Sequence, residues 1–132
     1  MADRTSTPTH KLRRLWLAIG WLLVAVVTYL SLIPAPPSTG ITGGDKVAHV
    51  LAYVTLMSWF LQLYPPHRRP LLAISFILMG IGLECLQGLT AWRSFDYIDM
   101  AANIGGVALG WLLGKTRLSI ALSVIEAHFT RA

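Results

Sequence analysis

The sequence predicts an all-α fold, a four-helix transmembrane bundle with both termini in the cytoplasm, on three observations. Hydrophobic residues make up 55% of the 132 residues and charged residues only 13%, whereas a typical soluble domain carries about 25% charged residues. Four apolar runs follow one another, each close to the ~20 residues that a helix needs to cross a bilayer. The lysines and arginines stand in short groups at the ends of these runs, so the net charge of +5 does not indicate nucleic-acid binding.

The first apolar run covers residues 15–33, which contain no charged side chain. A polar tail of residues 1–14 precedes it and ends in a positive flank formed by Lys11, Arg13 and Arg14. A cleaved signal peptide is the alternative interpretation, but its apolar region would be only ~7–15 residues long and would precede a small-residue cleavage site. This run is longer and ends at Pro34. We therefore expect a helix that is retained in the membrane.

A proline-rich stretch at residues 34–37 ends the first helix, because proline lacks an amide donor and clashes with the preceding turn. Residues 38–44 then form a glycine-rich loop. Asp45 follows the loop and suits the first turn of a helix, where a negative charge is favourable. The second apolar run, residues 47–64, is therefore predicted to be the second transmembrane helix.

Two further runs complete a membrane domain at residues 15–114. Residues 65–70 contain three prolines and two arginines, so a tight, basic connection is expected before the third helix at residues 71–89. The fourth helix starts near Asp96 and extends to Leu113. Small residues at a spacing of four let neighbouring membrane helices approach closely. Three glycines have this spacing and are predicted to pack against another helix: Gly106, Gly110 and Gly114.

The tail at residues 115–132 is predicted to be cytoplasmic, with a short amphipathic helix on the membrane surface. Its apolar face is formed by Leu118, Leu122, Ile125 and Phe129. The opposite face carries Ser119, Ser123, Glu126 and Arg131. A helix that binds a partner protein explains the same pattern equally well.

The distribution of cations sets the orientation. Seven lysines and arginines lie next to the helix ends at the start of the first helix, between the second and third, and after the fourth: Lys11, Arg13, Arg14, Arg68, Arg69, Lys115 and Arg117. The other two connections carry only Lys46 and Arg93. Because cytoplasmic loops of membrane proteins are rich in Lys and Arg, residues 38–46 and 90–97 are predicted to be extracytoplasmic.

This topology brings polar side chains from three helices to the outer end of the bundle. Spacings of three and four residues turn the polar groups of each helix to one face, and such groups are costly in a membrane unless they face a bundle interior or a wet cavity. We therefore predict a shallow polar pocket formed by Asp45, Lys46, His49, Tyr53, Glu84, Gln87, Arg93, Asp96, Asp99 and Asn103. The alternative is that these groups only hold the helices together.

The chemistry of this pocket leaves several uses open. Its excess of acids suits a hard cation such as Mg²⁺ or Ca²⁺, but no spacing diagnostic of a metal loop is present, and we predict no metal and no cofactor. In a closed network, Lys46 and Arg93 would pair with acids while His49 would hydrogen-bond Glu84 or Gln87. His49 and Glu84 also suit acid and base catalysis, yet the sequence contains no nucleophile motif. Three nearby aromatic residues are interpreted as an interfacial belt or as a platform for a sugar or headgroup: Trp92, Phe95 and Tyr97.

Several segments resemble the VanZ-like family of small bacterial membrane proteins. They are DKVAHVLAY from Asp45, GLECLQ from Gly82, a short loop with Arg93, and FDYIDMAANIGGVALG from Phe95. The likeness covers residues from about 15–114, and the motif residues occur in the expected order. The resemblance implies a four-helix, multi-pass protein of the bacterial cytoplasmic membrane. One founding member of that family is linked to reduced susceptibility to a lipoglycopeptide antibiotic that targets cell-wall precursors.

The resulting prediction is a membrane protein that binds or modulates an envelope lipid or a cell-wall precursor lipid at its outer face and so affects glycopeptide-type antibiotic susceptibility. An enzyme that modifies a lipid or cell-wall headgroup is the first alternative. A structural partner in a larger helix bundle is the second. Membrane lipids are the expected partners in each case.

Overall fold

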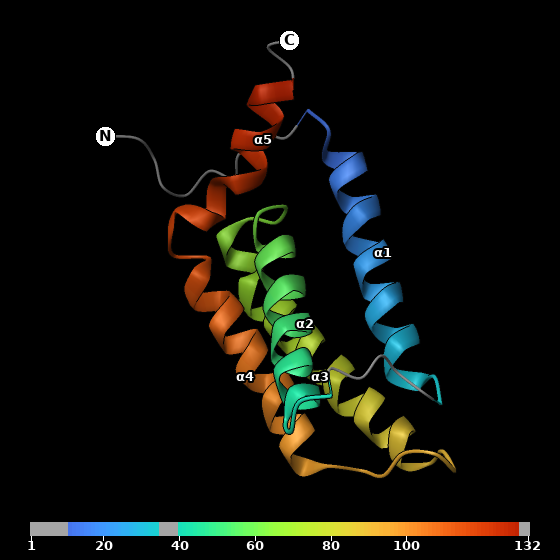
Figure 1. Cartoon of the computed structure of the whole chain (residues 1–132). Helices are drawn as coiled ribbons and strands as arrows, with labels where there is room; N and C mark the ends of the chain where they lie inside the picture. Colours follow the sequence, from blue (N-terminus) through green and yellow to red (C-terminus); the bar gives the residue numbers. More distant parts are fainter. Residues whose placement is uncertain (1–10, 35–39, 130–132) are drawn as a thin grey trace.

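The computed structural model describes residues 11–34 and 40–129, which are all-helical. The helices are α1 (Arg13–Leu32), α2 (Gly44–Leu61), α3 (Arg69–Gly88), α4 (Tyr97–Leu113) and α5 (Ala121–Phe129), with short 3-10 turns η1 (Pro66–Arg68) and η2 (Arg117–Ile120). The four long helices run alternately up and down, and α5 lies at the same end as the start of α1 (Figure 1). The predicted tail up to residue 10 and most of the proline-rich stretch lie outside the described residues.

Two helices in the described part of the chain are long and apolar enough to cross a membrane. They are α1 and the continuous helical segment Pro66–Gly88. A third span results only if α4 and the segment Arg117–Phe129, which are bent by 76° relative to each other, are counted as one. The all-α prediction is confirmed, whereas four crossings remain a prediction, because α2 carries Asp45 and Lys46 in its first turn and α4 is only 17 residues long.

Helix α2 forms the centre of the bundle and packs most closely against α4. A Cβ atom added at Gly106 would lie 2.6 Å from the carbonyl oxygen of Val50, and one at Gly110 would lie 2.7 Å from Cβ of Met57. At Gly114 the same atom would lie 2.5 Å from a methyl carbon of Leu61. The glycines at a spacing of four therefore occupy the contact with α2, and a side chain at Gly106 or Gly110 would push α4 and α2 apart, whereas at Gly114 the Leu61 side chain would have to move.

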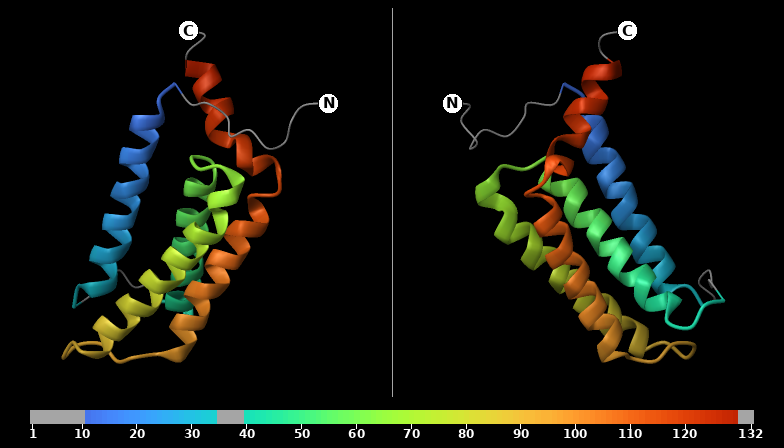
Figure 2. Two further views of the ribbon diagram at one scale, coloured as in Figure 1. Left: turned by 180° about the vertical axis from the view of Figure 1, so that it is seen from behind. Right: turned by 60° about the vertical axis from the view of Figure 1, so that its left-hand side comes forward.

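Helix α1 covers α2 and α3 only loosely (Figure 2). Its buried residues are Trp16 and Gly20, whereas Trp21, Leu22 and Tyr29 are each at least 60% exposed. Exposed apolar side chains also follow one face of α3, where Leu71, Ile74 and Leu78 are more than half exposed. These faces are the ones that a bilayer would cover.

The third helix begins earlier than predicted. Residues Pro66–Arg68 form a 3-10 turn that leads directly into α3 at Arg69, and Pro70 lies in the first turn of α3. Proline is compatible with the first turn of a helix because the amide that it lacks would have no partner there. The prediction that the prolines keep this stretch non-helical was therefore wrong.

The tail helix α5 docks on the bundle through a face that the hydrophobic pattern does not show. Leu122 is 2% exposed and packs with Trp16 and Leu63, while its amide donates to Oε1 of Gln62 at 2.9 Å. Glu126, predicted on the polar face opposite Leu122, is also buried. The two are four residues apart and share one side of the helix, whereas Leu118, Ile125 and Phe129 are exposed.

Glu126 is buried because its carboxylate satisfies donors at the start of α1. It accepts hydrogen bonds from the amides of Lys11 and Leu12, and from Nε1 of Trp16 at 3.0 Å. The first amides of a helix have no intrahelical partner, and an acidic side chain is favourable there. These three hydrogen bonds explain why Glu126 is buried rather than on a solvent-exposed face of α5.

Candidate functional site

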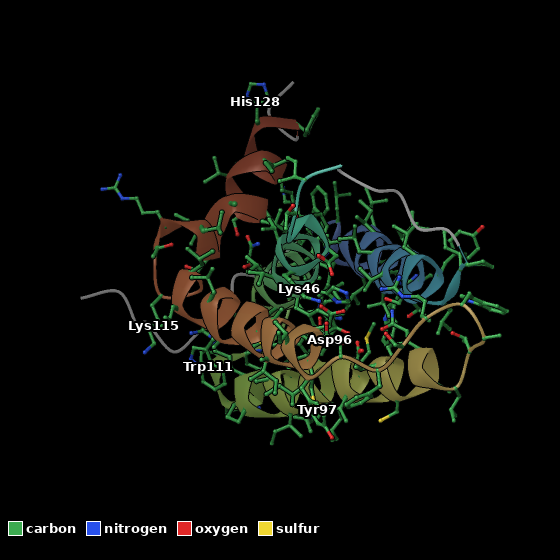
Figure 3. All side chains as sticks on the ribbon, turned by 60° about the horizontal axis from the view of Figure 1, so that its bottom comes forward. Lys46, Asp96, Tyr97, Trp111, Lys115 and His128 are labelled. Atoms are coloured by element: carbon green, nitrogen blue, oxygen red, sulfur yellow. The ribbon has the colours of Figure 1, made fainter. Side chains whose placement is uncertain are left out.

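The polar residues gather at the end of the bundle where α2 begins, α3 ends and α4 begins (Figure 1). The alternating directions of the helices bring these three ends together, as the predicted topology requires. At the centre of the group is Lys46. Its Nζ lies 2.9 Å from Oδ2 of Asp45 and 2.6 Å from Oδ2 of Asp96, and it also pairs with Oδ1 of Asp99. Figure 3 shows Lys46 and Asp96 adjacent to each other.

The three acids around Lys46 differ in their surroundings. The side chain of Asp45 is 54% exposed and that of Asp99 only 6% exposed. Asp96 precedes α4 and caps it, because its Oδ1 accepts a hydrogen bond from the amide of Ile98 at 2.7 Å. The hydrogen bond from Lys46, together with this cap, lowers the pKa of Asp96 from its ordinary value. The ammonium group of Lys46 occupies the space among the carboxylates in which a cation would otherwise be bound.

His49 connects α2 to α4. Its Nδ1 lies 2.9 Å from Oδ1 of Asn103, and its Nε2 lies 3.6 Å from Oδ2 of Asp99. The contact with Asn103 joins the middle of the first half of α2 to α4. His49 therefore contacts neither Glu84 nor Gln87 by a hydrogen bond, and the partners expected for a closed network were wrong.

Glu84 is 1% exposed and only partly satisfied. Its Oε1 accepts a hydrogen bond from the amide of Asp96 at 2.7 Å, which fixes the connection between α3 and α4 to the end of α3. Its Oε2 has no hydrogen-bond partner within the described part of the chain, and neither has the buried hydroxyl of Tyr53. These two polar atoms leave hydrogen-bonding capacity unused.

Gly80 and Ser31 also build the site, and neither was predicted from the sequence. A Cβ atom at Gly80 would lie 3.0 Å from Cβ of Asn103 and 3.3 Å from Cζ of Tyr53, so α3 needs a glycine to pass these side chains. The carbonyl oxygen of Ser31 accepts a hydrogen bond from Nε2 of Gln87 at 2.7 Å, which joins α3 to the end of α1. A main-chain acceptor is invisible in a search for polar side chains.

A cavity of about 260 Å³ lies beside this cluster, between the end of α1, the first half of α2 and the end of α3. Five of the predicted pocket residues line it: Asp45, His49, Tyr53, Gln87 and Arg93. The other five, Lys46, Glu84, Asp96, Asp99 and Asn103, form the adjoining network. Arg93 has no ion pair or hydrogen bond with any side chain that the structure describes, so the expected pairing of Arg93 with an acid was wrong.

The remaining predicted groups lie outside the cavity. Trp92, Phe95 and Tyr97 are 52%, 36% and 77% exposed and do not line it. The rings of Phe95 and Tyr97 pack edge to face with centroids 4.7 Å apart. Within residues 11–34 and 40–129, no group of three or more His, Cys, Asp or Glu side chains is arranged to hold a metal ion.

The fold and the site define an all-helical protein with at least two helices able to cross a membrane and a polar network at one end. No protein-family model matches the chain, and no solved structure matches it. The chain is similar to an uncharacterized protein of the fission yeast Schizosaccharomyces pombe, with 30% identity over 106 residues, which are 77% of this chain and 64% of that protein. The chain thus spans slightly less than two thirds of the length of this relative, whose description assigns no activity.

Proposed function

We propose that the protein is a VanZ-like integral membrane protein that binds the phosphate-bearing headgroup of an envelope lipid or a cell-wall precursor lipid. In this proposal the four long helices cross a bacterial cytoplasmic membrane, with the start of α1 and all of α5 in the cytoplasm. The seven-to-two distribution of lysines and arginines between the two ends supports this orientation. The polar network and its cavity then lie at the extracytoplasmic face, where such headgroups are found.

The observation that carries the proposal is the unpaired Arg93 on the wall of a 260 Å³ cavity. Lys46 is neutralised by three carboxylates, whereas Arg93 has no acid partner among the described side chains. A guanidinium group binds phosphate through two parallel hydrogen bonds. Asp45 lines the same cavity, and its exposed carboxylate can accept hydrogen bonds from hydroxyl groups of a headgroup. A closed structural network would have paired Arg93 internally.

Binding is better supported than catalysis. His49 lines the cavity, but its Nδ1 is hydrogen-bonded to Asn103 and its Nε2 lies 3.6 Å from Oδ2 of Asp99, so both ring nitrogens are turned toward α4. Glu84, the second candidate for acid and base chemistry, is 1% exposed and is not on the cavity wall. The acid and base pair suggested by the sequence therefore lacks the geometry that an enzyme needs.

The test is to identify the lipids that co-purify with the protein. The protein is extracted from native membrane into polymer-bounded nanodiscs, and its lipids are quantified by mass spectrometry against the bulk membrane. We expect enrichment of one phosphate-bearing lipid class, and a drop of about tenfold or more in that enrichment in Arg93→Gln, because a charge-assisted contact is lost. Arg117→Gln, an exposed cation at the other end, is the matched control and should retain the enrichment.

Two results would contradict the proposal. One is a lipid composition identical to the bulk membrane, which would favour a purely structural bundle partner. The other is an enrichment that Arg93→Gln leaves unchanged. The resemblance to the VanZ-like family supplies a second readout: cells carrying Arg93→Gln should accumulate the protein normally but lose its effect on susceptibility to glycopeptide-type antibiotics.

A further inference from the structure

A second cavity lies toward the opposite end of the bundle, between α1, α2 and α3, and has a volume of about 390 Å³. Its wall is mainly apolar and includes Trp21 and Val24 of α1, Phe60 of α2, and Leu71, Phe76 and Met79 of α3. None of its lining residues lines the first cavity. It is therefore a separate site, and the headgroup proposal does not use it.

The length of the cavity and the helices around it suit the acyl chain of a lipid. Its wall on α3 extends from Leu71 to Met79, which at ~1.5 Å per residue covers about 12 Å. This is close to the ~15 Å depth of one leaflet of the hydrocarbon core. The two helices that flank it, α1 and α3, are those with the length and hydropathy of membrane spans. An apolar opening between such helices faces acyl chains rather than water.

One end of the cavity is positively charged. Arg68 belongs to the wall and is exposed, and its side chain has no ion pair or hydrogen bond with the described residues. The guanidinium of Arg13 lies 5.5 Å from the ring centroid of Tyr64, which is also part of the wall. The one acid at this end within the described chain is Glu126, which is buried against the start of α1. An anionic group is thus the complementary ligand.

We infer that this cavity is a binding site for an anionic phospholipid of the leaflet on the side of α5, with an acyl chain between α1 and α3 and the phosphate at Arg68. Basic pockets between transmembrane helices suit lipids that carry extra negative charge. A zwitterionic lipid fills the same space, but its net charge is zero, so its electrostatic attraction to Arg68 is weaker. A second copy of the chain or another protein would cover the cavity without needing its depth.

Native mass spectrometry of the detergent-purified protein tests this site. The protein is mixed with dioleoyl phosphatidylglycerol or with dioleoyl phosphatidylcholine, which share their acyl chains and differ in charge. We expect the anionic lipid to be retained at a concentration about fivefold lower. Arg68→Gln should remove this preference. Arg117→Gln, a cation at the same end that lines neither cavity, should keep it.

A second pair of variants separates shape from charge. Ser75→Phe fills the cavity without altering charge and should weaken retention of both lipids, with a melting temperature equal to or above that of the parent. If Ser75→Phe melts lower, Val24→Phe from the α1 side replaces it in the same test. Equal retention of the two lipids by the parent protein would overturn the inference, and so would equal losses in Arg68→Gln and Arg117→Gln. A stable dimer of the lipid-free protein that excludes both lipids would instead assign the cavity to a second copy.

Discussion

Each end of the bundle buries a glutamate, and the two carboxylates differ in how fully they are satisfied. Glu126 accepts hydrogen bonds from two amides and from the indole of Trp16, on both of its oxygens. Glu84 accepts one, from the amide of Asp96, and its Oε2 has no partner among the described residues. Buried polar groups that serve only the fold are normally satisfied. The contrast holds for the two carboxylates: Glu126 is fully used in holding α5 to the start of α1, whereas Glu84 retains unused hydrogen-bonding capacity at the polar end.

The largest expected effect concerns the side of the membrane on which each end lies. In a Cys85→Ala background, a cysteine at Ser94 should react with an impermeant thiol reagent in intact cells, and one at His67 should react only after the cells are opened. Both positions are exposed, so accessibility within the protein does not decide the result. The opposite labelling pattern would place the polar cavity in the cytoplasm and remove the basis for an outer-leaflet ligand.

Removing the central cation should cause the largest loss of stability at the polar end. Lys46→Met leaves three carboxylates next to one another, including Asp99, whose side chain is only 6% exposed. The Lys46–Asp99 pair is only partly buried, so the loss should lie between the ~0–1 kcal/mol of an exposed pair and the ~3 kcal/mol of a buried one, and the unfolding temperature in detergent should fall. Lys115→Met, at an exposed position of the other end, is the control and should change the free energy of unfolding by less than about 0.5 kcal/mol. If Lys46→Met and Lys115→Met unfolded at the same temperature, the ion pairs of Lys46 would contribute little to stability.

At the α5 end, the conservative change Glu126→Gln should lower the free energy of unfolding by about 1–3 kcal/mol. An amide has one acceptor oxygen, so its NH₂ group would face a donor, either the indole of Trp16 or the amides before α1. Thermal unfolding measures the loss, and Trp16→Phe should remove part of the difference between Glu126 and Gln. A neutral Glu126→Gln would mean that the second oxygen is not needed and that the contrast between the two ends does not hold.

The same change at the polar end should have the smallest effect. In Glu84→Gln the amide oxygen still accepts from the amide of Asp96, and the NH₂ group replaces an oxygen that has no donor. The free energy of unfolding should change by less than about 0.5 kcal/mol, whereas Glu84→Ala should lose about 1–3 kcal/mol. The amount of protein in the membrane and the unfolding temperature, measured for the parent, Glu84→Gln and Glu84→Ala, check this prediction. A large loss in Glu84→Gln would mean that the negative charge itself holds the helices together.

The sequence predicted the grouping of the polar residues but not their pairing. Spacings of three and four residues place His49, Asp99 and Asn103 on inward faces, and alternating helix directions bring the three helix ends together. The partner of His49 was missed because periodicity does not fix the rotation of α3 relative to α2. Arg93 was predicted to belong to the pocket and lines the cavity, but it lies in a connection without periodicity, so the sequence did not show that it would have no acid partner. Glu126 was misplaced because a carboxylate that caps another helix is indistinguishable in sequence from a solvated one.

We propose that the polar end holds a ligand against Arg93, and an experimental structure of the protein extracted with its native lipids is the sharpest test of this proposal. We expect ordered non-protein density in the 260 Å³ cavity, within hydrogen-bonding distance of the Arg93 guanidinium. Lys46 should remain among Asp45, Asp96 and Asp99 as described here. A structure in which Arg93 pairs with one of these acids and the cavity is closed would contradict the claim.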